Sequence, residues 1–521
     1  MPLPEGGKTP WPPRALAGPD QQIAVWDAWY RGDPDEISSL YGGARSYAGA
    51  AGDFFGSESG RPGLLGRART AFTRWFWGTR LTPGEQRTKY HVPLPADICK
   101  ASAQLLYSEP PTALVGDSTT QARLDELMDD GMHAVLAEAA ELEAARGGGY
   151  LRVVWDRNMR PRPWIASAST RHAVPEWRWG ELAAVTFWRV LHCDGDKVRR
   201  HLERHERGVI LHGLYDGTRD TLGLAVGLEA DPATAGLKPA VPTGLKDRLT
   251  AVYVPNMRPT IWEDNPAAAH LGRSDLHQCE PLFDGLDETL SSWMRDVRQA
   301  RGRLIVPESM LESQGPGKGA VFDQDREIYS GLNILQRAGG TTDLTIVQFA
   351  IRVAEHRDTC DELTELTLRA AGYSSQTFGG TGDAAMTATE VNARERRSFI
   401  TRDRKILYQR PAISEILETL LMVDALMIGT RGIVPERPSI AFGDSVSEDM
   451  LTLANTAEVL HRAQAASTDA LVRLVHPDWA EPQIAEEVDR IHVEFGLVAS
   501  DPTEVGADPV TEPPDPEPTY A

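Results

Sequence analysis

Apolar side chains recur every three to four residues in several long stretches of the chain, which is the spacing of one buried face on an α-helix. The stretches that predict helices are residues 94–107, 120–146, 282–301, 342–371, 387–428 and a helical block over about 448–495. The stripe over residues 282–301 is the most regular, and its members are Leu282, Leu286, Leu290, Trp293 and Val297. Pro411 lies inside the longest predicted helix, where its missing N–H predicts a kink.

From residue 150 the hydrophobic period changes to two, which is the period of a strand with one buried face. The segments with this pattern are residues 150–156, 163–169, 173–179, 182–191, 197–206, 209–217 and 251–257. We expect an antiparallel sheet of about five or six strands, followed by a stretch at 216–250 that glycine and proline punctuate. Helices before and after such a sheet define the fold class α+β.

Composition narrows the class of protein further. A hydrophobic fraction of 41% excludes wholesale disorder. No apolar run approaches the roughly 20 residues that cross a bilayer, and the first residues lack the order of a signal peptide. We therefore expect a soluble protein made in a cytoplasm, with no membrane partner and with four separated cysteines as reduced thiols. Residues 1–24 are expected to form an arm, and the acidic tail 501–521 is expected to be disordered.

The formal net charge is −21, the opposite sign to that of a protein that grips duplex DNA through its phosphates. Two interpretations of this charge stay open. It can serve solubility alone, or it can provide a surface that must not adhere to nucleic acid.

Sequence motifs of catalysis are not legible in the chain. The segment GPGKGA around Lys318 lacks the spacing of a phosphate-binding loop, and no G-x-S-x-G elbow occurs. His201 and His205 would share one face of a strand, where we expect them to face solvent. No catalytic residue, cofactor or metal site is predicted, which favours a structural subunit over an enzyme.

One basic segment stands out in the predicted helix 387–428. Its cationic residues are Arg394, Arg396, Arg397, Arg402, Arg404, Lys405 and Arg410. They could pair with acidic residues of the same or a neighbouring subunit. Alternatively, some of them could line a surface near DNA.

Four stretches, in their order along the chain, carry a family resemblance. They are YHVPLPADICKASAQLLYSEPP, GRSDLHQCEPLFDGLDETLSSWMRDVRQARGRLIVPES, TATEVNARERRSFITRDRKILYQRPAISEILETLLMVDAL and VRLVHPDWAEPQIAEEVDRIHVE. With the order of α+β region, helix, strand-like insertion, helix, Gly-rich loop, long helix and helical block, the chain resembles the portal proteins of tailed, siphovirus-like double-stranded DNA bacteriophages. The resemblance covers about residues 25–495.

The resemblance implies a portal fold and a division of the chain into parts. These would be an α+β wing at 25–275, stem helices at 276–301 and 343–372, a small α/β clip at 302–342, a tunnel loop at 373–386, a long kinked wing helix with its return at 387–445, and a helical crown at 446–500. The tunnel-loop residues would be Thr377, Gly379, Gly380, Thr381, Gly382, Asp383 and Met386. Clip residues that dock terminase or adaptor would be Arg303, Glu308, Glu312 and Lys318.

The function implied by the resemblance is a conduit. Twelve copies would form a ring at one capsid vertex of the virion, assembled in the host cytoplasm, through which DNA is packaged and later ejected. Its partners would be the DNA in the channel, the terminase large subunit, a head–tail adaptor, the major capsid protein and a scaffolding protein. An acidic channel would repel phosphate and let DNA slide. The alternatives are another phage head or tail structural protein, or a packaging enzyme.

Overall fold

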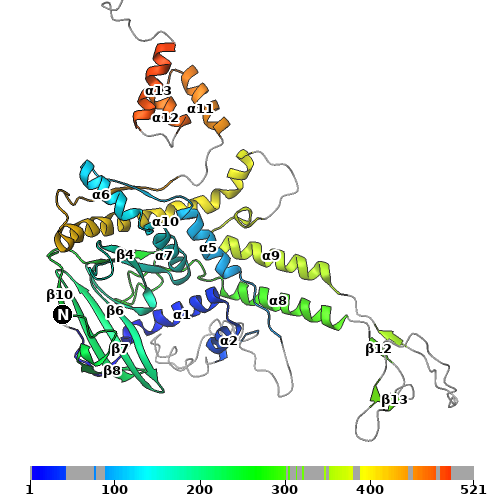
Figure 1. The fold of residues 1–521 in the computed structure, drawn as a ribbon. Coiled ribbons are helices and arrows are strands. Elements are labelled where there is room, and N and C mark those ends of the chain that lie inside the picture. The colour runs from blue at the N-terminus through cyan, green and yellow to red at the C-terminus, as the bar shows by residue number, and fades with distance from the viewer. Residues whose placement is uncertain are drawn as a thin grey trace, which may run out of the picture. The chain divides into compact units, whose positions relative to one another are not determined.

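The computed structural model describes residues 3–42, 76–77, 88–300, 303–305, 312–313, 320–321, 345–347, 351–379, 388–443, 450–476 and 481–494. The chain divides into two compact units, Met1–Gly443 and Asp444–Ala521. The helices and antiparallel sheets of the chain confirm the α+β class (Figure 1).

A group of helices forms the N-terminal side of the first unit. They are α1 (Ala17–Arg31), α2 (Pro34–Gly42), α5 (Leu94–Tyr107), α6 (Ser118–Met128) and α7 (Met132–Arg146). The single helix expected over residues 120–146 is wrong, because the chain breaks at Gly131, whose φ of +82° only glycine adopts readily. Gly147, with φ +85°, ends α7 and passes so close to Gly272 that a side chain there would clash with backbone.

The larger sheet is wholly antiparallel and has the strand order β1-β9-β8-β7-β6-β5, with β10 also paired to β8. Its strands are β1 (Gly7–Pro10), β5 (Ala173–Arg178), β6 (Glu181–Asp194), β7 (Lys197–Glu206), β8 (Val209–Thr218), β9 (Thr221–Val226) and β10 (Ala240–Pro242). The expected N-terminal arm is therefore partly an edge strand, and Trp11 behind it is buried. Strands β9 and β10 lie in the stretch 216–250 that glycine and proline punctuate.

A second antiparallel sheet has the order β11-β3-β4, so the expectation of one sheet is wrong. Its strands are β3 (Gly148–Val154), β4 (Trp164–Ser169) and β11 (Ala251–Pro255). The 3-10 turn Thr170–His172 separates β4 from β5 and directs the chain into the other sheet. A small ribbon pairs β2 (Thr112–Leu114) with β16 (Ser439–Ala441).

The two histidines on β7 are buried, which corrects the expectation that they face solvent. His201 is 3% exposed and stacks on His212, with ring centroids 5.3 Å apart. His205 is 1% exposed and lies 2.6 Å from the Thr250 hydroxyl. The second sheet covers this face of β7, since Arg152 of β3 pairs with Glu203 at 2.7 Å. Burial lowers the pKa of His201 to about 4.

Two further helices, α8 (Glu280–Gln299) and α9 (Val353–Ala371), flank the segment with the short strands β12 (Arg303–Ile305), β13 (Glu312–Ser313), β14 (Ala320–Val321) and β15 (Thr345–Val347). Strand β12 pairs with β15 and β13 with β14, both antiparallel. The prediction that a helix begins near residue 342 is thus wrong, because the β-branched run Thr345–Val347 forms a strand paired with β12 instead, and α9 begins only at Val353.

The long helix α10 (Ala388–Val423) contains Pro411 and continues into a π-helical turn at Asp424–Ile428, as expected for residues 387–428. Its buried residues include Ile406, Ile413 and Leu420, at seven-residue spacing, and they pack in the core beside α7 and the second sheet. None of the helices in the described part of the chain combines the length and apolar composition that crossing a bilayer requires.

The second unit is helical in its described part. It contains α11 (Met450–Arg462), α12 (Thr468–Val475) and α13 (Glu481–Glu494). The Ser467 side chain caps α12 by accepting a hydrogen bond from the Ala470 N–H.

Candidate functional site

Helices α8 and α9 pack side by side in antiparallel directions (Figure 1). Asp296, near the end of α8, accepts hydrogen bonds from Arg352 and His356 at the start of α9, at 3.0 Å each. The Trp293 and His356 rings stack with centroids 6.1 Å apart. At the other end, Leu363 of α9 lies beside Gly285. The two helices therefore form a hairpin whose open end leads into the β12–β15 ribbon.

The apolar stripe predicted for α8 is only partly covered in the part of the chain that the structure describes. Leu286 is buried, whereas Leu282, Leu290 and Trp293 are half-buried and Val297 is 42% exposed. An amphipathic helix with an incompletely covered apolar face is typical of a surface that packs against another chain.

The opposite face of α8 is polar and buried, a feature that the sequence analysis missed. Asp287 accepts hydrogen bonds from the Trp77 indole at 3.2 Å and the Val92 N–H at 2.8 Å, and His91 Nδ1 lies 2.8 Å from it. The Ser291 hydroxyl accepts from the Tyr90 N–H at 2.9 Å. These contacts fix α8 to the segment that precedes α5.

Asp284 lies one turn before this group and is 7% exposed. Burial raises the pKa of its carboxyl to about 7, and the nearby Asp287 and Glu288 charges add to the increase. Its ionisation therefore costs stability as pH rises from the ordinary aspartate value toward about 7. We expect Asp284→Asn to raise the free energy of unfolding at pH 8 by ~1–3 kcal/mol and to change it little at pH 4. Urea denaturation at both pH values tests this, with exposed Asp361→Asn as the control; equal effects at the two pH values would contradict it.

A buried salt bridge joins α10 to the loop that leads into α8. Lys405 Nζ lies 2.5 Å from Asp275 Oδ2, and both side chains are 2% exposed or less. Lys405 also donates to the Ser102 hydroxyl of α5, while the Tyr373 hydroxyl, just after α9, donates to Asp275. The side-chain amide of Asn256 also donates a hydrogen bond to the Asp275 carboxylate, at 2.8 Å. Five separate parts of the chain thus meet at one ion pair at the base of the helix hairpin.

Some of the cationic residues of α10 are buried and others are exposed. Lys405 is buried and paired with Asp275. Arg402 is buried and donates to the carbonyls of Leu105, at 2.7 Å, and Gly443. The side chains of Arg396, Arg397, Arg404 and Arg410 are exposed, and Arg394 lies in the first turns of α10. Only the exposed members are accessible to a neighbouring subunit or to DNA.

The predicted tunnel-loop and clip residues lie partly outside the described residues. Thr377 is hydrogen-bonded to the Ser398 hydroxyl of α10 at 2.8 Å, and Gly379 ends a 3-10 turn with φ +76°. Arg303 lies in β12 and Glu312 in β13. The residues outside the described part are Gly380, Thr381, Gly382, Asp383, Met386, Glu308 and Lys318.

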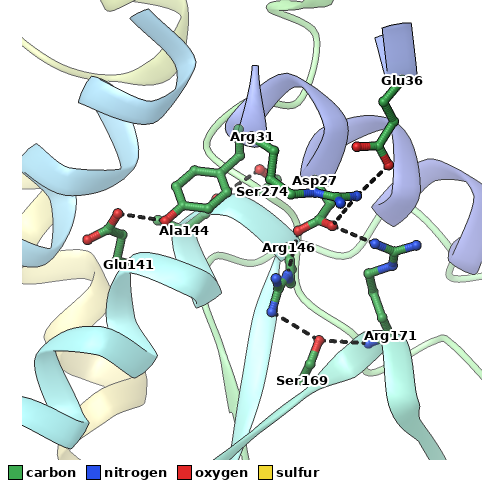
Figure 2. Close-up of polar contacts among 10 residues, drawn as sticks. Asp27, Arg31, Glu36, Glu141, Ala144, Arg146, Ser169, Arg171 and Ser274 are labelled. Carbon is green, nitrogen blue, oxygen red and sulfur yellow. Dashed lines mark hydrogen bonds and ion pairs between the residues drawn. The ribbon is translucent and has the colours of Figure 1, made fainter. Parts of the chain in front are cut away.

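A second polar cluster anchors α1 to the rest of the first unit (Figure 2). The Asp27 carboxylate is 1% exposed and contacts Arg146 at 2.7 Å, Arg171 at 2.5 Å and Arg31 at 3.1 Å. Ser169 accepts from Arg146 at 3.2 Å. Burial opposes ionisation of Asp27, but the three guanidinium groups outweigh it and lower the pKa of the carboxyl. The cluster is a structural joint between α1, α7 and the start of the larger sheet.

The arrangement of side chains does not assemble a recognisable reaction centre in the described part of the chain. No group of three or more histidine, cysteine or acidic residues there is placed to hold a metal ion. All four cysteines have free thiols, and Cys99 and Cys279 are buried.

Comparison with known proteins gives a likeness at the level of structure alone. No family model matches the chain. No curated protein matches it either. Among solved structures, a chain of "Neck of empty GTA particle computed with C6 symmetry" is 14% identical, with a TM-score of 0.41, and the match covers 80% of this chain and 96% of that one. A chain of "Neck of native GTA particle computed with C12 symmetry" has the same identity and coverage and a TM-score of 0.39.

Proposed function

We propose that this chain is the portal subunit of a phage-like particle, a conduit rather than an enzyme. In this proposal twelve copies form a ring at one capsid vertex of the virion, and double-stranded DNA passes through it during packaging and ejection. The observation that carries the proposal is the antiparallel hairpin of α8 and α9, whose connecting segment returns through the β12–β15 ribbon. A stem with a clip at its end requires this order.

Two other features support the ring. The stripe of α8 is only half covered by the residues that the structure describes, and such a face suits packing against another copy of the chain. The excess of 75 acidic over 54 basic residues suits a channel wall that does not adhere to phosphate. Residues 373–386 after α9 would form the tunnel loop, and the exposed arginines of α10 would meet a neighbouring subunit or the DNA. The clip would dock the terminase large subunit and the head–tail adaptor, and capsid and scaffolding proteins would surround the ring.

Electron microscopy of the purified chain tests the proposal. We expect closed rings with a central hole at least as wide as a DNA duplex. Val297→Asp should abolish the rings, because a charge would enter the apolar stripe of α8, whereas Leu224→Asp, at a still more exposed apolar position on β9, should leave them intact. Sheets or shells instead would favour another head or tail protein, and ATPase or nuclease activity would favour a packaging enzyme.

A further inference from the structure

The hairpin between β5 and β6 displays an unusual tip. Arg178 pairs with Glu181, so the connecting loop consists of Trp179 and Gly180 alone. Both have positive φ, +54° and +88°, as the favoured two-residue hairpin turn requires. Asparagine or aspartate suits the first position, whereas a bulky side chain there is conformationally unfavourable. Trp179 is nevertheless in that position, and it is 92% exposed. Its ring contributes almost nothing to the core of its own chain.

A hollow of about 500 Å³ lies beside this tip. Four arginines line it, namely Arg207, Arg248, Arg258 and Arg437, together with the acids Glu181, Asp247 and Glu415. Arg248 is paired with Glu418, which leaves Arg207, Arg258 and Arg437 as the cations that can meet a partner. A second hollow, of about 440 Å³, is lined by Trp179 itself and shares Arg207 and Glu181 with the first. The exposed indole and the arginine-lined hollow therefore form one continuous surface.

The same surface contains an unused hydrogen-bond donor and an open strand edge. Trp177 lines the first hollow, and its buried indole Nε1 has no acceptor among the described residues. Strand β5 is the last strand of the larger sheet in the described part of the chain, and it carries Pro175, which suits an edge strand. Tryptophan and arginine are enriched at the binding hot spots of protein interfaces.

We propose that the Trp179 hairpin and the adjoining arginine-lined hollow bind an acidic face of a neighbouring copy of this chain. Charge identifies the partner, because a chain of net charge −21 offers acidic surface on every copy, and Arg207, Arg258 and Arg437 of the hollow complement it. A ring also requires a head-to-tail contact, in which one surface meets a different surface of the next copy. The inference rests on the proposed ring, but it concerns a surface distinct from the α8 stripe.

Assembly of the purified full-length chain tests the inference. Trp179→Ala and Arg207→Glu should each raise the concentration at half-assembly by at least about tenfold, as loss of a hot spot does. Mass photometry over a dilution series measures this change. The matched controls are Met159→Ala, which removes an apolar side chain that is 74% exposed on another turn, and Arg219→Glu, which makes the same charge change at the β8–β9 turn. Both should assemble like the unaltered chain, and all four variants should keep its circular dichroism spectrum.

A photo-crosslinking amino acid at position 179 identifies the occupant. In isolated rings we expect covalent dimers in which the attached peptide comes from this chain and is rich in aspartate and glutamate. Normal assembly of Trp179→Ala and Arg207→Glu, with crosslinks only inside one chain, would overturn this inference and leave the proposed ring intact. Crosslinks to capsid protein in assembled heads, without dimers in isolated rings, would also overturn it. Failure of the unaltered chain to form any ring would refute both proposals.

Discussion

Replacing Lys405 with methionine should lower the free energy of unfolding of the first unit by about 3–5 kcal/mol. The substitution removes one partner of a buried ion pair and leaves the Asp275 carboxylate without its cation inside the protein. The Tyr373 and Asn256 donors remain, but they do not neutralise the charge. The measurement is the shift of the urea midpoint followed by circular dichroism, made at a concentration where the chain is monomeric.

The neighbouring Arg404 provides the matched control for this prediction. It lies on the same helix and is exposed, so Arg404→Met should change stability by less than about 0.5 kcal/mol. Adding Asp275→Asn to Lys405→Met should recover part of the loss, because the uncompensated charge disappears. If Lys405→Met and Arg404→Met have the same small effect, the ion pair does not hold the base of the α8–α9 hairpin together.

Local periodicity predicted much of the secondary structure. The helix at residues 94–107 and the strands between 150 and 217 were predicted with bounds close to those observed, because one face of each element is apolar. Local periodicity does not predict where a helix is interrupted or replaced by a strand. Gly131 splits a helix whose apolar pattern continues across the break. The segment Thr345–Val347 fits a helical stripe as well as a strand, and it is a strand because it pairs with β12, which is distant in the sequence.

The polar interior was not predictable, because a buried polar residue has the same sequence pattern as a solvent-facing one. Asp284, Asp287 and Ser291 recur at helical spacing opposite the apolar stripe of α8, where solvent is the usual environment. They are buried because residues 76–77 and 88–92, some 200 positions earlier, lie against that face. His201 is buried for the same reason, since the second sheet covers it.

The basic segment of α10 shows the same limit for the candidate site. Spacing alone does not separate Lys405, which faces the core and binds Asp275, from Arg404, which is exposed one position earlier. A helix turns by about 100° per residue, so adjacent cations face different surroundings. Only the partner on the loop before α8 shows that Lys405 is structural. The proposal of contacts to a neighbour or to DNA therefore concerns Arg396, Arg397, Arg404 and Arg410.

Asp27→Ala should lower the free energy of unfolding by about 3 kcal/mol at pH 7, because it leaves Arg146 and Arg171 without their shared carboxylate (Figure 2). Since the pKa of Asp27 is lowered in the folded state, its contribution is present above the ordinary aspartate pKa and is lost as pH falls through the lowered value. The difference between variant and unaltered chain should therefore shrink below about pH 3.9. Asp35→Ala, at an exposed position on α2, should cost less than about 0.5 kcal/mol at either pH. Thermal unfolding of both variants at pH 7 and pH 3 tests this prediction. If Asp27→Ala lowers the free energy of unfolding equally at both pH values, the substitution disturbs the packing of α1 and not the ion-pair cluster.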